Sequence, residues 1–379
     1  MLRLKEAQAA GCAHPPAEEP VARARLTVDL DAIARNFAAV RGALSQGAAS
    51  AVVKRDAYGL GLVPVVRSLA AAGCRVFWVE TFEEGLSVRQ AVAGARVFVL
   101  QGLAGRRPQD FVEARLIPAL GTAEEIALSA QAAPRMSVAI NLDTGLGRMG
   151  VLPDAFREIA AGSGLKSLDV AVLMSHLAGF SEPDRDGNRS QLALFQELSA
   201  LVPDALPSIA TSSFVYAGPR WHIGLARVGS ALYGVHSARI AGYRSEPVIA
   251  LDAPVLSVQG LRAGSRLGYR GDRINEPRRI ATIALGYADG LPEAFTDRCS
   301  AFVNNRRAAF VGDAAMTTTC VDVTGLADTG IRPRQCVEIV GPNQDINVLS
   351  GALGINANRL LVAFGLSTHR TYRGGGSHG

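Results

Sequence analysis

A lysine at the end of a short apolar run is the first residue in this sequence that could carry chemistry. Residues 51–61 read AVVKRDAYGLG, so Lys54 follows an apolar run and Tyr58 lies four positions further on, among glycines. A lysine at the end of a strand is usually a solvated surface residue. Where apolar walls and neighbouring cations lower its pKa, the free amine instead becomes available as a nucleophile that forms a Schiff base, and as a general base. The local pattern leaves both interpretations open.

Other polar residues follow apolar runs in the same way. If these runs are strands of one parallel barrel, their carboxyl ends meet on one face, where barrel enzymes place their active sites. Cationic side chains, small hydroxyl residues and accessible backbone N–H groups on that face would suit an anionic ligand that carries a phosphate. The residues in question are Lys54 with Tyr58, Asp143 with Arg148, His176, Thr211 with Ser212 and Ser213, and Arg227 with Gly229 and Ser230.

The stretch GLGRMG at 145–150 formally matches the G-x-G-x-x-G pattern of dinucleotide-binding proteins. It follows the fifth apolar run, not the first, and the next residues, VLPDAF, place a proline where the phosphate-binding helix should run. A tight turn that projects Arg148 toward the strand-end face explains the pattern better. The guanidinium of Arg148 could hold a carboxylate there.

His176 ends a buried run, and a lone histidine in such a place is more often a core residue than a catalytic one. Arg227 as a neighbour shifts this balance. Two cations at strand ends are costly unless they act on a ligand or on an acid of tuned pKa.

The elements that must position these residues are short runs rich in Val, Ile and Leu without strict alternation. Such runs are typical of strands buried on both faces of a parallel sheet. Segments with apolar residues at helical spacing lie between several of them, for example at 61–73, 156–164 and 190–202. Eight runs with mostly helical connections predict a (β/α)8 TIM-type barrel, with an open doubly wound sheet as the alternative. The runs are 50–54, 75–80, 96–101, 116–121, 136–143, 169–176, 207–213 and 226–234.

The residue pattern of the sequence changes after about residue 245. Short β-branched segments divided by Gly, Pro, Asn and Asp, such as RRIATIALGY and TTTCVDVTGL, predict an all-β C-terminal domain. The first residues carry Pro-Pro and several glutamates and lack a continuous apolar stretch. We therefore expect a disordered arm at 1–25, a barrel at 26–245 and a β-domain at 246–379.

Composition and charge exclude several classes of protein. Of the 379 residues, 48% are hydrophobic and 19% charged, which is a globular balance. The net charge of +5 comes from scattered arginines without the basic stripe of a nucleic-acid- or membrane-binding surface. Five cysteines without a C-x-x-C spacing indicate neither a disulfide framework nor a metal site. We expect a soluble cytoplasmic protein that binds no metal, nucleic acid or membrane.

Taken together, the motifs resemble those of the alanine racemases, which are fold-type III pyridoxal phosphate enzymes. The resemblance runs from LTVDLDAIARNFAAVR at 26–41 to about residue 372. AVVKRDAYGLG resembles the family's lysine motif, with Arg55 in place of the usual alanine. The other matching stretches are NLDTGLGRMG (141–150), LMSHLAGFSEPD (173–184), LARVGSALYG (225–234), LGY (267–269) and IALGYADGLP (283–292).

The resemblance implies how the cofactor is held. Lys54 would carry pyridoxal phosphate covalently, and Arg227 would face the pyridine nitrogen. Because an arginine does not readily give up a proton, that nitrogen would stay largely unprotonated. This limits delocalisation into the ring and the side reactions that follow from it. The positions that match phosphate contacts are Tyr58, Ser212, Gly229 and Ser230.

The resemblance also implies two bases, one on each face of the substrate Cα. Lys54 would supply one face, and Tyr269 of a second subunit the other, so the enzyme would be a homodimer with shared active sites. A tyrosine pKa of about 10 is too high for a base at neutral pH. We expect a cationic network of His176 and Arg227 to lower it. The residues implied on the substrate side are Arg148, the backbone N–H of Met316, Tyr287 and Asn141.

Several positions depart from the family pattern. Asn141 stands where many members have a lysine, often carbamylated, and a chloride ion can take over the role of that anion. The remaining departures, at positions expected to line the substrate side or its entrance, are Ser181, Glu293, Asp313, Thr317 and Leu366. Two substrates remain open: alanine, or a larger amino acid handled by a related racemase or epimerase. A decarboxylase is less favoured because no C-E-S-G-D-like motif occurs, and a non-catalytic pyridoxal phosphate-binding protein because such relatives have the barrel alone.

Overall fold

The computed structural model describes residues 23–376, apart from residues 237, 239, 241, 244 and 270 and the side chain of Ala327. In this part of the chain there are two compact units. The first, called here the barrel unit, comprises Leu30–Glu246 with residues 374–376. The second, called the β unit, comprises residues 23–29 and Pro247–Arg373.

The barrel unit is built around one parallel sheet of eight strands. The strands pair in the order β8-β7-β6-β5-β4-β3-β2-β9. Thr211, just after β8, bridges Arg227 of β9, so the sheet closes on itself. The predicted (β/α)8 barrel is therefore confirmed over an open doubly wound sheet. The strands are β2 (Ala48–Val52), β3 (Val76–Val79), β4 (Arg96–Val99), β5 (Ile117–Leu120), β6 (Ser137–Leu142), β7 (Asp169–Ser175), β8 (Leu206–Ser208) and β9 (Leu225–Val228).

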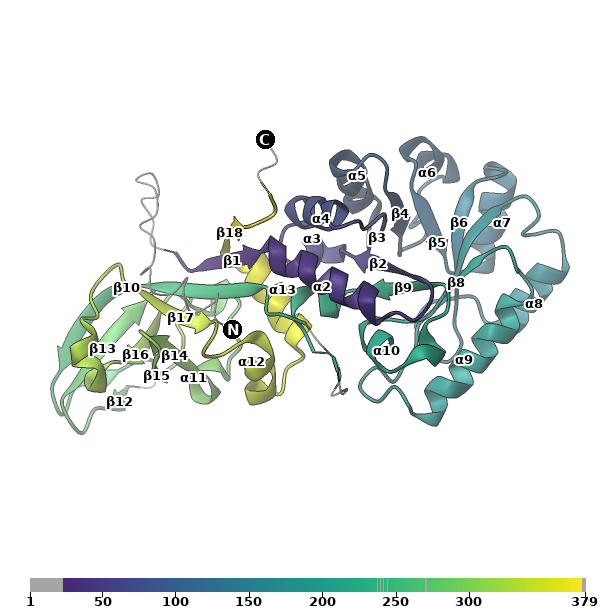
Figure 1. Cartoon of the computed structure of the whole chain (residues 1–379). Coiled ribbons are helices and arrows are strands. Elements are labelled where there is room, and N and C mark those ends of the chain that lie inside the picture. The colour runs from purple at the N-terminus through teal and green to yellow at the C-terminus, as the bar shows by residue number, and fades with distance from the viewer. Residues whose placement is uncertain are drawn as a thin grey trace. The chain divides into compact units, whose positions relative to one another are not determined.

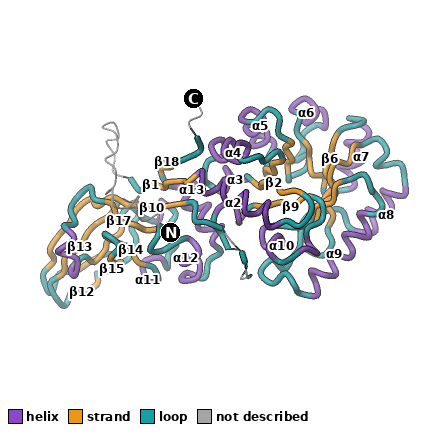
Figure 2. The backbone as a smooth tube through the Cα atoms, in the orientation of Figure 1, coloured by secondary structure: helices purple, strands orange, loops and turns teal. Residues whose placement is uncertain are grey.

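Helices surround these strands on the outside, as Figures 1 and 2 show. The helices predicted at 61–73, 156–164 and 190–202 correspond to α4, α8 and α9, with ends that differ by a few residues. The helical elements are α2 (Leu30–Ala43), α3 (Lys54–Tyr58), α4 (Leu62–Ala71), α5 (Phe82–Ala91), α6 (Pro108–Ala114), α7 (Ala123–Ala132), α8 (Pro153–Ala161), α9 (Asp186–Ser199), α10 (Ser212–Tyr216), η1 (Pro219–Trp221) and η2 (Ser230–Tyr233).

The inside of the barrel is filled by inward-facing side chains of the strands, mostly aliphatic with two large aromatic rings. Trp78 and Phe98 are fully buried and stack with their ring centroids 4.2 Å apart. The indole N–H of Trp78 donates to the Ser50 hydroxyl, which in turn donates to the backbone carbonyl of Ala226. A buried indole needs such a partner, because an unpaired donor would lose its hydration without compensation. This packing fixes the strands whose ends carry the polar residues.

The β unit contains an eight-stranded sheet in the order β13-β16-β15-β14-β17-β10-β1-β18. The long strand β10 (Ile249–Leu261) pairs with β13 (Arg278–Ile283) from Val255 onward, with an irregularity between Val255 and Ser257, and this pairing closes part of the sheet. The other strands are β1 (Arg25–Asp29), β11 (Arg266–Leu267), β12 (Asp272–Arg273), β14 (Ser300–Val303), β15 (Arg306–Val311), β16 (Thr319–Asp322), β17 (Cys336–Val340) and β18 (His369–Arg373). The helices are η3 (Tyr287–Asp289), α11 (Phe295–Arg298), η4 (Thr324–Thr329), α12 (Ile346–Leu353) and α13 (Ala357–Ser367).

The start of the described chain differs from the predicted division. Strand β1, which the sequence placed at the start of the barrel domain, pairs with β10 and β18 and so belongs to the β unit. Its buried residues Leu26 and Val28 alternate with more exposed ones, as expected for a strand with one face covered. Residues 1–22 of the predicted arm lie outside the described residues, whereas Ala24 is already buried. At the other end, Gly375 donates to a carboxylate oxygen of Asp31 in the barrel unit.

In the described residues, no single helix has both the length and the apolar composition to cross a membrane. The successive helices α12 and α13 meet the composition test only together, and they are bent by 115°. The cytoplasmic location expected from the sequence stays a prediction.

Candidate active site

The strand-end residues singled out in the sequence do come together in the barrel unit. The charges of Arg227, Arg148 and Lys54 all act on the imidazole of His176, which places these side chains around one point. Lys54, Arg148 and His176 follow the carboxyl ends of β2, β6 and β7, and Arg227 is the last residue but one of β9. The parallel register of the sheet is the reason, because it brings all these ends to the same edge of the barrel.

Lys54 begins a turn of unusual backbone conformation. The four residues from Arg55 to Tyr58 have φ values of 54°, 57°, 53° and 59°, and Gly59 follows at 85°. Each non-glycine residue in this left-handed region costs about 1–2 kcal/mol, so the surroundings must enforce the turn. Two carboxylates do so: Glu84 accepts from the backbone N–H of Asp56, and Asp56 accepts from that of Leu62 at 2.6 Å. Backbone strain of this kind is found mostly at functional sites.

The Lys54 ammonium forms an ion pair with Glu80, with 2.7 Å between Nζ and Oε2. Sequence reasoning missed Glu80, although it ends the predicted run at 75–80. The register between β2 and β3 was the signal that could have found it. Val52 lies opposite Trp78, and so Lys54 lies opposite Glu80, two positions further along each chain.

A small group of residues, called here the cradle, lies beside the lysine turn and consists of Tyr58, Ser212 and residues 229–231. The Ser212 hydroxyl accepts from the backbone N–H groups of Gly229 and Ala231, at 3.2 and 3.1 Å. A Cβ on Gly229 would lie only 2.3 Å from the hydroxyl oxygen of Tyr58, so only glycine permits this approach. Burial, and then the charge of Glu80, raise the pKa of Tyr58 to about 12. The phenol therefore stays protonated at neutral pH and can donate a hydrogen bond to an anion.

These observations test whether the site fits a phosphate-bearing cofactor. The cradle offers a phenol, a buried serine hydroxyl and the start of η2 at Ser230, with a glycine where a side chain would block access. The lysine that could bind an aldehyde begins the same five-residue element that ends at Tyr58. The donor set matches a molecule with a phosphate at one end and a carbonyl at the other.

Arg227 is a buried cation held by backbone groups. It is 4% exposed, and its terminal nitrogens donate to the carbonyls of Ser208 and Ser175 at 2.7 and 2.6 Å. Its guanidinium also lies 5.6 Å from the ring centre of Trp78. Burial, followed by the charge of Arg148, lowers the pKa of Arg227 to about 10. Arg227 thus remains charged at neutral pH.

His176 is neutral, which corrects the cationic role expected from the sequence. Burial, and then the charges of Arg227, Arg148 and Lys54, lower the pKa of its imidazole to about 3. A second positive charge beside these cations would be too costly in a partly desolvated site. Any lowering of a tyrosine pKa by this cluster must therefore come from the guanidinium groups and not from an imidazolium.

The segment 143–151 is the tight turn that the sequence predicted, and not a dinucleotide-binding loop. The Asp143 carboxylate accepts from four successive backbone N–H groups, from Gly145 to Arg148, at 2.9–3.2 Å. Burial raises the pKa of Asp143, but these bonds outweigh it and leave the pKa below its usual value. The Asn141 side-chain amide donates to the Met149 carbonyl at 3.0 Å. Asn141 and Asp143 thus fix the turn that carries Arg148.

The remaining predicted site residues lie in the β unit. Tyr269 follows β11 and is 82% exposed, while Tyr287 and Met316 are 53% and 58% exposed. Tyr287 and Met316 lie close together, because the Tyr287 N–H donates to Ala315 at 3.0 Å and Ala288 donates to Met316 at 2.9 Å. These three side chains have little packing around them within their own unit.

The five substitutions that depart from the family pattern are all exposed. They are Ser181 in the barrel unit and Glu293, Asp313, Thr317 and Leu366 in the β unit. The hairpin that carries Tyr269 lies against one of them, since a Cβ on Gly268 would be 3.5 Å from Gly312 Cα and 3.9 Å from the Asp313 nitrogen. None of the five is part of a packed core, so the core does not dictate their identities.

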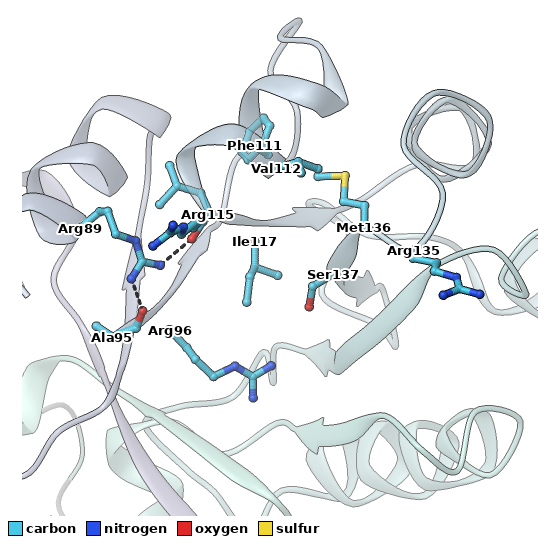
Figure 3. A pocket seen from close by; sticks show the side chains of 11 residues that line it. Arg89, Ala95, Arg96, Phe111, Val112, Arg115, Ile117, Arg135, Met136 and Ser137 are labelled. Atoms are coloured by element: carbon cyan, nitrogen blue, oxygen red, sulfur yellow. Dashed lines mark hydrogen bonds between the residues drawn. The ribbon is translucent and has the colours of Figure 1, made fainter. Parts of the chain in front are cut away.

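Figure 3 shows a cavity of about 340 Å³ elsewhere in the barrel unit. Arg96, Ile117 and Ser137, which begin β4, β5 and β6, line it, so it lies at the opposite edge of the sheet from Lys54. Its arginines include Arg89, which donates to the carbonyls of Ala95 and Arg115 and so holds the ends of two connections. This cavity is separate from the strand-end site.

Two family models match the chain almost end to end. The model described as "Alanine racemase, N-terminal domain" matches residues 28–237, and "Alanine racemase, C-terminal domain" matches residues 248–372. The chain belongs to the alanine racemase family. The resemblance that the motifs indicated is thereby confirmed over both units.

Individual relatives agree with this assignment to the alanine racemases. The catabolic alanine racemase of Agrobacterium fabrum is 34% identical over 358 residues, which cover 93% of this chain and 92% of the relative. The alanine racemase of Acidiphilium cryptum is 36% identical over 345 residues, or 90% of this chain and 96% of the relative. The crystal structure of alanine racemase from Bartonella henselae, with covalently bound pyridoxal phosphate, superposes with a TM-score of 0.86 at 28% identity, covering 93% of this chain and all of that one.

Proposed function

We infer that this protein is a pyridoxal phosphate-dependent racemase that interconverts L- and D-alanine. The observation that carries this inference is the geometry around Lys54. A lysine with a left-handed turn behind it lies beside Gly229, which Tyr58 approaches too closely for any side chain. Membership of the alanine racemase family over both units supports the same conclusion.

The residues of the barrel unit fit the cofactor at both ends. Lys54 would hold it covalently, and Tyr58, Ser212, Gly229 and Ser230 would hold its phosphate. Bound pyridoxal phosphate supplies an electron sink that acidifies the Cα proton of an amino acid. Arg227, a charged donor fixed by two backbone carbonyls, would face the ring nitrogen and keep it from gaining a proton.

Two residues of this chain would move the protons. The Lys54 amine, once released from the cofactor, would take or return the Cα proton on one face. Tyr269 of a second copy would act on the other face. Its 82% exposure within its own unit supports a role in contact with another chain. The protein would therefore work as a homodimer in which each active site uses both chains.

The substrate carboxylate would be held by Arg148 and by the backbone N–H of Met316, with Tyr287 beside it. The turn fixed by Asp143 and Asn141 would position Arg148 for this task. The amide nitrogen of Asn141 donates one of its two N–H groups to Met149, so the second N–H and the amide oxygen can serve other partners. A chloride ion near Asn141 stays a prediction that this bond neither requires nor prevents.

The proposal is tested by incubating the holoenzyme with L-alanine in D₂O and following both chirality and Cα deuterium. The wild type should invert alanine with deuterium incorporation. Tyr269→Phe should keep cofactor attachment at Lys54 and exchange the Cα proton without inversion, because one base is missing. If Tyr269→Phe inverted alanine at the wild-type rate, the two-base assignment would be wrong.

A racemase for a larger amino acid is the second candidate. The five exposed departures favour it, in particular Leu366, which is 50% exposed where an aromatic pocket residue is expected. Incubating L-serine, L-lysine and L-arginine separately under the same conditions tests it. Inversion of alanine alone would reduce the departures to neutral variation around an ordinary alanine racemase.

A further inference from the structure

Gln191 is a buried side chain on α9 that none of the roles above uses. It is 5% exposed, and its amide oxygen accepts from the backbone N–H of Ala178 at 3.0 Å. Its amide nitrogen donates to the backbone carbonyl of His176 at 3.3 Å and to the hydroxyl of Thr144 at 3.5 Å. One side chain thus bonds both the segment after β7, which carries His176, and the turn after β6, which carries Arg148.

The partners of this amide fix its orientation. The His176 carbonyl can only accept a hydrogen bond, and the Ala178 N–H can only donate one. The amide nitrogen must therefore face the carbonyl, and the amide oxygen must face the N–H. In this orientation both N–H groups of Gln191 and its oxygen have partners, as a buried amide requires.

Two buried hydroxyls extend the bond between Gln191 and Thr144 toward β6. The Ser175 hydroxyl donates its one proton to the Leu142 carbonyl at 2.8 Å. Its oxygen lies 2.8 Å from the Thr144 hydroxyl and must accept the proton of Thr144, whose own oxygen is left to accept from Gln191. The chain of bonds thus runs in one direction from α9 to the end of β6. It also reaches Arg227, which donates to the Ser175 carbonyl at 2.6 Å.

The same glutamine packs against the turn that carries Arg148. A Cβ on Gly145 would lie 3.4 Å from Gln191 Cγ, which is van der Waals contact. Within the turn, the Asp143 carboxylate accepts from the backbone N–H of Gly145 at 2.9 Å and from that of Arg148 at 3.2 Å. The turn is therefore held by a carboxylate of its own and by an amide from α9, and a shift of either would move the base of the Arg148 side chain.

Asn188 lies three residues earlier on α9 and offers a contrast. It is 2% exposed, and its amide oxygen accepts from the Gly179 N–H at 3.0 Å. Its amide nitrogen donates to the carbonyls of Gly179, Glu182 and Pro183 at 2.9–3.0 Å. These partners all lie in the loop 179–183, so Asn188 holds this loop, whereas Gln191 bonds to the turn as well.

We propose that Gln191 is a positioning residue for Arg148, which holds the turn that carries Arg148 at a fixed place beside the segment of His176 and thereby sets how tightly the substrate carboxylate binds. This inference rests on the proposed function, because it takes Arg148 to hold that carboxylate. Gln191 acts through Arg148 and not on the reacting atoms. It places a determinant of substrate affinity on a helix outside the barrel.

A purely structural role for Gln191 would have different consequences. A glutamine that only stabilised the fold would, when replaced, lower the free energy of unfolding and leave the KM for alanine unchanged. A glutamine that orients the Arg148 guanidinium should affect KM, and this effect should depend on the guanidinium being present. Arg148→Lys keeps the positive charge as a flexible point charge without a planar fork, so little is left to orient.

The experiment measures KM and kcat of the holoenzyme for L-alanine, together with cofactor affinity and the free energy of unfolding in denaturant. The first variant is Gln191→Met, which keeps an unbranched side chain and removes its hydrogen bonds, in the wild-type and in the Arg148→Lys background. Thr144→Val, which removes only the hydroxyl between Gln191 and Ser175, serves if Gln191→Met does not fold. Asn188→Leu is the matched control, because it also replaces a buried amide of α9 by an apolar side chain.

We expect Gln191→Met to raise KM about five- to tenfold, as the loss of one or two ordinary hydrogen bonds would, with kcat and cofactor affinity within about twofold of wild type. In the Arg148→Lys background, the same change should alter KM by less than about twofold. Thr144→Val should raise KM about threefold, because it breaks one bond of the chain. Asn188→Leu should lower the free energy of unfolding and leave KM within about twofold of wild type.

Three results would overturn the inference. An unchanged KM in Gln191→Met would leave the glutamine a purely structural role. A rise in KM that is as large in the Arg148→Lys background, or as large in Asn188→Leu, would mean that Gln191 does not act through Arg148. A loss of cofactor affinity as large as the rise in KM would place Gln191 on the cofactor side. Failure of the wild type itself to invert alanine would overturn the proposed function, and it is distinguished from the other results because it appears before any variant is made.

Discussion

The two units present their candidate site residues in opposite ways. In the barrel unit, Arg227 and Ser212 are each 4% exposed and are fixed by hydrogen bonds to backbone groups. In the β unit, Tyr269 is 82% exposed and Met316 58% exposed. Arg227 and Ser212 are held by packing and hydrogen bonds, whereas Tyr269 and Met316 are largely exposed within their own unit. The residues proposed to hold the cofactor thus all lie within the barrel unit, whereas Tyr269, Tyr287 and Met316, proposed for the substrate side, lie in the β unit.

This contrast follows from what each half must do. A phosphate and an aldehyde need fixed donors and a nucleophile at a defined place, and a closed parallel barrel provides these at the ends of its strands. In the proposed mechanism, the base that acts on the opposite face of the substrate comes from a second chain. An exposed tyrosine on a hairpin suits that task once a second chain covers it.

We expect the largest loss of activity when Lys54 is removed from the barrel unit. Lys54→Ala should lose covalent attachment of the cofactor and reduce alanine racemisation by about a thousandfold or more, because nucleophile and base disappear together. Lys166→Ala is the control, since Lys166 is exposed and outside the site. Measurements of inversion and of the lysine-bound absorbance check this. Attachment retained in Lys54→Ala would contradict the assignment of the barrel site.

A methyl group in the cradle should have the next largest effect. In Gly229→Ala the new Cβ would lie 2.3 Å from the Tyr58 hydroxyl, so the ring or the turn must move. We expect cofactor affinity to fall about tenfold to a hundredfold. Equilibrium titration with pyridoxal phosphate measures this, with Gly94→Ala, which has open space at its Cβ, as the matched control. Unchanged affinity would mean that the cradle does not hold the phosphate.

The variant Asn141→Ala tests whether substrate binding can be weakened without a change in cofactor binding. The lost bond to the Met149 carbonyl should loosen the turn that carries Arg148 and raise KM for alanine about fivefold, the value of one ordinary hydrogen bond. Cofactor attachment should not change. Steady-state kinetics with and without chloride check this, and a kcat effect without a KM effect would place Asn141 in a different role.

The last prediction concerns the stability of the fold against acid and not the activity. The pKa of His176 in the folded protein, about 3, lies below the usual value of about 6.5, so between these pH values the unfolded chain binds the additional proton. Neutral His176 therefore contributes stability above pH about 6.5, and this contribution is lost as the pH falls toward 3. In His176→Gln, the free energy of unfolding in denaturant should decline less steeply over this range. A slope equal to that of the wild type would contradict a neutral His176.

The sequence predicted the barrel well because each strand is a local apolar run, and each of the eight runs contains at least part of an observed strand. It assigned residues 26–29 to the barrel and predicted no strand there, because the partners of β1, which are β10 and β18, are distant in sequence and no local pattern specifies them. Motifs indicated Lys54, Arg227 and Gly229. The sequence did not predict the contact between Glu80 and Lys54 or the charge state of His176, because both depend on which side chains the closed sheet brings together.

The measurement that tests the shared active site most directly is complementation between two inactive chains. Lys54→Ala and Tyr269→Phe proteins are each purified, mixed under conditions that exchange subunits, and assayed for alanine racemisation. If Tyr269 acts across the dimer, mixing should restore about one quarter of wild-type activity, because about half of the dimers are mixed and each has one intact site. Activity that stayed at the level of the separate variants after proven exchange would place both bases on one chain and contradict the account.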